Sequence, residues 1–171
     1  MSAGPFFILK LPPLKKTYRG RTVCDTFEAA ISFVGRTSLE IIQPMNNDPS
    51  MFREVLDKKG EGALHHVFPD FRAMDDLEYN ARRKKYADLG LAIACEFSIP
   101  DLGYNIFYDS PDGSGTFIEL SQVTPQGFQI CLNMYEAHRT WDGKTPFRDI
   151  AEAVPRSHMP VILAEAAPLA L

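Results

Sequence analysis

Two glutamates in apolar surroundings are the first residues in this chain whose types and spacing could do chemistry. The segments Thr37–Gln43 and Thr116–Gln122 carry threonine, glutamate and glutamine at matching positions, so Glu40 and Glu119 are equivalent members of an internal repeat. Because side chains alternate along a strand, both carboxylates should project from the same relative face. A buried carboxylate is costly unless it is paired, hydrogen-bonded or bound to a cation. The alternative is that each glutamate faces solvent on a half-exposed sheet.

A pair of adjacent histidines is the second candidate feature. His65 and His66 lie in the apolar run Ala63–Phe68, which has the composition of a strand. Adjacent residues on a strand point to opposite faces, so we expect at most one of them to share a surface with Glu119. One imidazole and two carboxylates suit a divalent ion that keeps positions open for substrate oxygen. A core histidine hydrogen-bonded to a carbonyl is the alternative.

The elements that must position these groups follow from periodicity and turn residues. Strands are expected over Pro5–Leu11, Thr22–Val34, Thr37–Gln43, Ala63–Phe68, Leu91–Phe97, Tyr104–Asp109 and Thr116–Gln122. Helices are expected over Ser50–Lys59, about Met74 to Leu89, and Phe128–Arg139. The strands on either side of Gly35–Arg36 should form a hairpin.

Length and composition exclude several classes of protein. The chain has 171 residues, 45% of them hydrophobic, which is enough for one core of ordinary size. A formal charge of -4 gives no broad positive field, so we expect no nucleic-acid partner. No apolar run is long enough for a membrane span or arranged as a secretory signal, so we expect a cytoplasmic protein without a membrane partner. The three cysteines, Cys24, Cys95 and Cys131, are widely spaced and are expected to be core thiols.

Five short segments, in this order, resemble the vicinal oxygen chelate superfamily of glyoxalase I, methylmalonyl-CoA epimerase, extradiol dioxygenases and bleomycin-resistance proteins. They are Gly4–Phe7, Tyr18–Arg21, Leu39–Pro44, Gly62–Val67 and Phe117–Leu120. The resemblance implies an α+β fold in which paired βαβββ modules pack curved mixed sheets into a cleft. Residues 1–124 would form this domain, with module 1 at about 4–44 and module 2 at about 61–124. Residues 125–171 would be a C-terminal helical extension and tail, which we expect Trp141 to anchor.

The chain departs from the family pattern at its start. The family has a strand and a helix before the segment at Gly4, whereas only three residues precede Gly4 in this sequence, so we expect an incomplete first module. Four explanations stay open: the gene product starts further upstream, a partner chain completes the module, three protein ligands suffice, or metal binding has been lost. An exposed sheet edge would invite pairing, so we expect a homodimer.

The resemblance also implies a site. His66, Glu119 and Glu40 would bind a divalent metal ion (Zn, Mn, Ni, Co or Fe). Glu40, Glu119 and Tyr104 are the candidate catalytic side chains, although Tyr104 could equally serve packing. The expected function is that of a glyoxalase-like lyase or isomerase, acting on a small oxygen-bearing substrate through a metal-stabilised enolate.

Two alternatives to this function remain. One is a non-catalytic protein that binds a small hydrophobic or aromatic compound in the same cleft without metal. Its wall would be formed by aromatic side chains: Phe27, Phe33, Tyr104, Phe107 and Phe117. The other is a degenerate module that serves dimer assembly.

Overall fold

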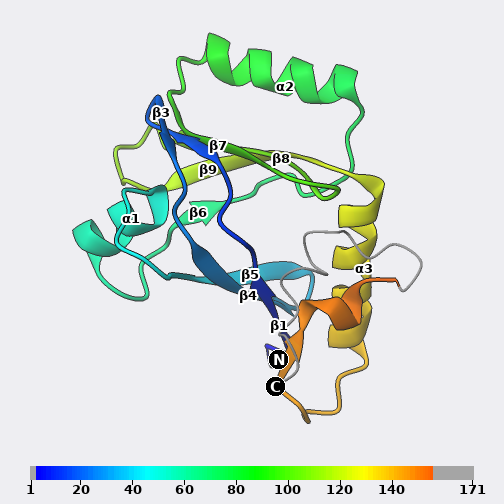
Figure 1. The fold of residues 1–171 in the computed structure, drawn as a ribbon. Coiled ribbons are helices and arrows are strands. Elements are labelled where there is room, and N and C mark those ends of the chain that lie inside the picture. Colours follow the sequence, from blue (N-terminus) through cyan, green and yellow to red (C-terminus); the bar gives the residue numbers. More distant parts are fainter. Residues whose placement is uncertain (1–2, 156–171) are drawn as a thin grey trace.

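The computed structural model describes residues 3–155, so the C-terminal tail after Pro155 lies outside the described residues. Within the described range the chain forms three α-helices and ten strands in two open, mixed sheets (Figure 1). The fold class is therefore α+β, as the sequence predicts.

The smaller sheet has four strands in the order β10-β1-β4-β5. Their bounds are β1 Phe6–Lys10, β4 Phe27–Val34, β5 Thr37–Pro44 and β10 Phe147–Asp149. The predicted hairpin is present: β4 and β5 pair antiparallel from Val34 with Thr37 to Phe27 with Pro44. Gly35 adopts φ 61° at the turn, a conformation that glycine reaches without steric cost. The hairpin leaves β5 at one edge of the sheet.

The larger sheet has six strands in the order β3-β2-β7-β8-β9-β6. Their bounds are β2 Lys16–Tyr18, β3 Arg21–Val23, β6 His66–Val67, β7 Ile93–Ile99, β8 Gly103–Asp109 and β9 Phe117–Val123. The strand expected at Ala63–Phe68 is reduced to two residues, which pair parallel with β9. This pairing puts β6 at the sheet edge beside the repeat segment that carries Glu119.

Three helices flank the sheets. They are α1 Met51–Lys59, α2 Asp76–Asp88 and α3 Pro125–Arg139, and each begins at a side-chain cap, Ser50, Asp75 or Thr124. Helix α2 lies across one face of the six-stranded sheet, and α3 runs from the end of β9 towards the four-stranded sheet (Figure 1). A short 3₁₀ helix, Ile150–Ala153, follows β10. The three helices confirm those predicted from periodicity.

The main core lies between the inner sides of the sheets and α3. Four of the aromatics expected to line an open cleft, Phe27, Phe33, Phe107 and Phe117, are buried there together with Met134 of α3. These four side chains therefore do not form an accessible cleft wall, because they are buried against neighbours such as Phe52 of α1 for Phe27 and Tyr135 of α3 for Phe33. The expectation of three core thiols is also wrong for Cys24, which is exposed.

Candidate functional site

Glu40, His66 and Glu119 meet although they come from three different strands. β5 at the edge of the smaller sheet carries Glu40, whereas the neighbouring strands β6 and β9 of the larger sheet carry His66 and Glu119. Nε2 of His66 lies 3.3 Å from Oε2 of Glu40 and 3.1 Å from Oε2 of Glu119. The two carboxylates of the internal repeat thus converge on one imidazole and link the two sheets.

The three side chains differ in exposure. The side chains of His66 and Glu119 are 11% and 12% exposed, and that of Glu40 is 29% exposed. Burial alone would lower the pKa of His66, but its hydrogen bonds to Glu119 and Glu40 raise it to about 10. Without a metal ion, the imidazole is therefore a cation at neutral pH, and Glu40 is the member of the group most accessible to solvent.

His65 fixes the other side of the His66 ring. The two Nδ1 atoms are 2.9 Å apart, and the rings meet edge to face. Burial and the nearby His66 lower the pKa of His65 to about 3, so His65 is neutral and its Nδ1 can accept a hydrogen bond from Nδ1–H of His66. The expectation that these histidines point to opposite faces is wrong, because His65 lies just outside the strand and alternation does not extend to it.

Three further residues surround the carboxylates. Ser121 Oγ donates to Oε1 of Glu119 at 2.6 Å and also lies 2.7 Å from the side-chain oxygen of Asn105. The serine thus engages one carboxylate oxygen and leaves Oε2 facing His66. Cys131 of α3 is mostly buried, and burial together with the charges of Glu40 and Glu119 raises its pKa to about 12. Its thiol is therefore protonated.

The donor types of this group fit a divalent ion. Two ligands bonded to one ion at about 2.1 Å lie about 3.0 to 3.4 Å apart, which is the separation of His66 Nε2 from each carboxylate oxygen. If His66 donates from Nδ1 to His65, the lone pair of neutral Nε2 faces two carboxylates, and only a cation makes that arrangement favourable. Within residues 3–155, no group of three or more His, Cys, Asp or Glu side chains is already arranged to hold a metal. Metal binding would therefore require these side chains to move from the positions described.

Tyr104, the third candidate catalytic residue, does not lie beside Glu40, His66 and Glu119. It pairs with Gln122 across β8 and β9, whereas Phe107 pairs with Glu119, so Tyr104 lies on the opposite face of the sheet. Its hydroxyl donates to Oε2 of Glu96 at 2.6 Å, and burial with this hydrogen bond raises its pKa. The phenol is therefore a poor acid at neutral pH.

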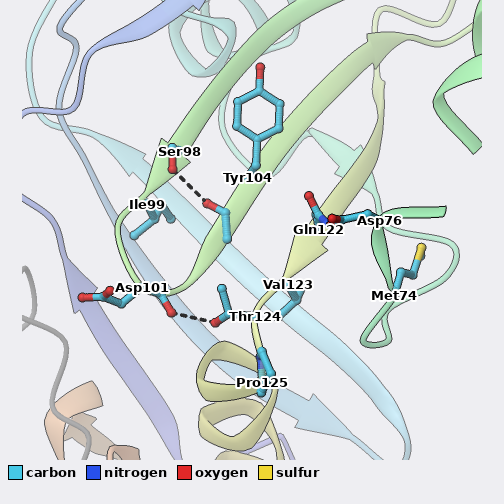
Figure 2. A pocket seen from close by; sticks show the side chains of 11 residues that line it. Met74, Asp76, Ser98, Ile99, Asp101, Tyr104, Gln122, Val123, Thr124 and Pro125 are labelled. Atoms are coloured by element: carbon cyan, nitrogen blue, oxygen red, sulfur yellow. Dashed lines mark hydrogen bonds between the residues drawn. The ribbon is translucent and has the colours of Figure 1, made fainter. Parts of the chain in front are cut away.

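Tyr104 instead borders a separate surface cavity of about 390 Å³, at the ends of β7, β8 and β9 and the start of α3 (Figure 2). Its polar lining includes Asp76, Ser98 and Gln122. The amide of Gln122 donates to Asp76, the first residue of α2. None of Glu40, His66 and Glu119 lines the cavity.

Sequence reasoning named His65 without placing it beside His66, and it missed Ser121, Asn105 and Cys131 as neighbours of the site. Strand parity could have found two of them: Asn105 and Ser121 share the face of Glu119 through the register of β8 and β9. Cys131 carries no comparable signal, because the helical pattern of α3 does not say which sheet it packs on.

No family model matches the chain, and no curated protein matches it. None of the helices among the described residues is long and apolar enough to cross a membrane.

Proposed function

We propose that this chain is a glyoxalase-like, metal-dependent lyase or isomerase of the vicinal oxygen chelate type, acting on a small oxygen-bearing organic substrate. The observation that carries the proposal is the convergence of Glu40 and Glu119 on Nε2 of His66. Titratable groups whose pKa values are shifted by burial and by specific charged partners, as those of His65 and His66 are, mark a candidate functional site. A cytoplasmic location stays a prediction from the sequence.

Charge balance supports a metal in place of the proton on His66. Two carboxylates and a protonated imidazole leave a net charge of about -1 in a mostly buried place, whereas a divalent ion with neutral His66 would cancel both carboxylates. His65 remains the acceptor for Nδ1 of His66 in both cases. When bound, the ion would act as a Lewis acid on substrate oxygen.

The residues of the chain then take different roles. His66 and Glu119 are the deeper groups, and each is held by a neighbour, His65 for the imidazole and Ser121 for the carboxylate. Both are suited to hold an ion. Glu40 has the most exposed side chain of the three, so it is the group that would move a proton to or from a substrate carbon beside a carbonyl.

The rival function, metal-free binding of an aromatic compound, receives no comparable support. It requires an accessible apolar wall, but Phe107 and Phe117 are 4% and 1% exposed and pack within the core.

Metal analysis of protein purified without chelator tests the proposal. We expect about one Zn, Mn, Ni, Co or Fe ion per chain, and its loss in His66→Ala and Glu119→Gln. The matched control is Glu96→Gln. This substitution neutralises a carboxylate on the same sheet, one that accepts a hydrogen bond from Tyr104 and lies away from His66. Folded wild-type protein that is free of metal and takes up none of these ions on dialysis would contradict the proposal.

Chemistry is tested separately by solvent deuterium exchange. Metal-loaded protein should introduce deuterium beside the carbonyl of a small carbon acid from a panel of oxo acids, and Glu40→Gln should abolish exchange while keeping the metal. If metal-loaded protein introduces deuterium into no member of the panel, the result would indicate a protein that binds the ion without catalysing this reaction.

A further inference from the structure

β5, with eight residues, is the longest of the strands that lie at the edges of the two sheets. One side of β5 pairs with β4 over the whole of Thr37–Pro44, and its other side pairs with no strand in the part of the chain that the structure describes. Alternate main-chain N–H and C=O groups along that side are consequently available to another strand.

The side chains of β5 do not protect this edge. Leu39 is 39% and Ile41 is 56% exposed, and both lie on the face opposite Glu40. The strand contains no lysine, its pairing with β4 shows no bulge, and its single proline stands at the last position, Pro44. A lysine, a bulge or a proline inside the strand would each discourage pairing, and β5 has none of these; its one inward-pointing charge, Glu40, is engaged by His66.

The internal repeat provides a second argument. The segment of β9 that repeats β5 has its corresponding edge covered, because β6 pairs with it at Phe117 and Ile118. Ser38 and Leu39 hold the matching positions of β5. Of two edges with related sequences, one has a strand partner, and the other has none among residues 3–155.

We propose that β5 pairs antiparallel with β5 of a second copy of this chain, so that the two four-stranded sheets become continuous in a two-fold dimer. Self-pairing of one edge closes the assembly at two copies, whereas pairing of β5 with β3 or β10 of another copy would be head-to-tail and would continue into a filament. This proposal is independent of the function proposed above.

Charge is compatible with this partner. Glu40 is the one charged residue of β5, and its carboxylate is directed to His66. A register that sets Ile41 opposite the partner's Ile41 also sets Glu40 opposite the partner's Ile42. The two carboxylates are then not placed directly against each other, and the exposed isoleucines are covered.

Sedimentation velocity at about 1, 10 and 100 µM tests the dimer. We expect wild-type protein to approach twice the 19.2 kDa of one chain, and Ile41→Lys to remain a monomer. The matched control is Leu77→Lys on α2, where an 82% exposed leucine receives the same charge. It should dimerise like the wild type. Circular dichroism of each variant confirms that it is folded.

Hydrogen exchange on wild-type protein gives a readout that needs no variant. Amides of the peptide 37–44 should exchange more slowly as the concentration rises, while those of α2 stay unchanged. A wild-type monomer at every concentration, a mass that keeps rising beyond the dimer, or a folded Ile41→Lys dimer would each overturn the proposal.

Discussion

The imidazole of His66 lies 3.1 Å from the carboxylate of Glu119, on two parallel neighbouring strands at the edge of the larger sheet. Glu40 approaches the same nitrogen from the other sheet, so one side chain joins the two halves of the fold. This contact holds charge in a mostly buried place, and its protonation should therefore be visible in both stability and metal binding.

The first prediction concerns the pH dependence of metal-stripped protein. The pKa of His66 is raised from 6.5 to about 10, so the folded state holds one proton more than the unfolded state between these values. The resulting stabilisation is fully present below about pH 6.5, declines as the pH rises, and is lost above about pH 10. The free energy of unfolding should fall by up to about 1.4 kcal/mol per pH unit across this window.

Urea unfolding at several pH values measures this slope. His66→Gln is the control, because it removes the titrating group while keeping a side chain that can donate to Glu40 or Glu119. The difference between wild type and variant should shrink as the pH rises. A constant difference across the window would mean that His66 is not a cation in the metal-free protein.

Ser121 should support metal binding without contacting the ion. Ser121→Ala removes the donor to Oε1 of Glu119, so the carboxylate is less well oriented. We expect metal affinity to fall by about 10- to 100-fold. Competition with a chromophoric chelator measures this. Ser98→Ala, which changes an exposed serine on the same sheet, should leave the affinity unchanged. Equal effects of the two substitutions would exclude a positioning role for Ser121.

The buried ion pair of Lys16 and Asp25, away from the site, should contribute strongly to the free energy of unfolding. Nζ of Lys16 lies 2.7 Å from Oδ2 of Asp25, both side chains are almost fully buried, and the ammonium lies 4.6 Å from the ring centroid of Phe27. Lys16→Met leaves the carboxylate buried and unpaired, so we expect a loss of about 3 to 5 kcal/mol in the free energy of unfolding. The double variant Lys16→Met, Asp25→Leu should recover most of this loss in urea unfolding. A single variant as stable as the wild type would show that Asp25 can reach water.

The junction between Gly4 and Trp141 tests how the C-terminal extension is held. A Cβ atom at Gly4 would collide with the Trp141 ring, whereas one at Gly60 would meet open space, and both glycines have positive φ. Gly4→Ala should therefore destabilise the protein by about 1 to 3 kcal/mol more than Gly60→Ala. Urea unfolding of the two variants gives the comparison. Equal losses would indicate that the ring moves aside freely.

The sequence was most informative where one local pattern decides the structure. Helix α1 has its serine cap and closing Gly60, and the β4–β5 hairpin has Gly35 at its turn. Both are governed by backbone geometry that neighbouring residues alone impose. The grouping of Glu40, His66 and Glu119 is implied by the resemblance, whereas the repeat alone predicts only that the two carboxylates take equivalent positions on their strands.

Features that depend on long-range packing could not be anticipated. The turn of the β2–β3 hairpin carries Arg19, whose partners Glu54 and Asp109 lie 35 and 90 residues further along the chain, so alternation gives no signal. Side-chain alternation could not predict the direction of His65, because the strand contains only His66 and Val67 and His65 lies outside it. Burial of Phe33 follows from its contact with Tyr135 of α3, which periodicity within either element does not reveal.

Cobalt(II) titration of the metal-stripped protein tests the central claim most directly, since the visible absorption of the ion reports its ligands. The account predicts a saturable spectrum at one ion per chain, abolished in His66→Ala and in Glu119→Gln and retained in Glu96→Gln. Folded wild-type protein that produces no saturable spectrum, or a spectrum that His66→Ala leaves intact, would contradict it.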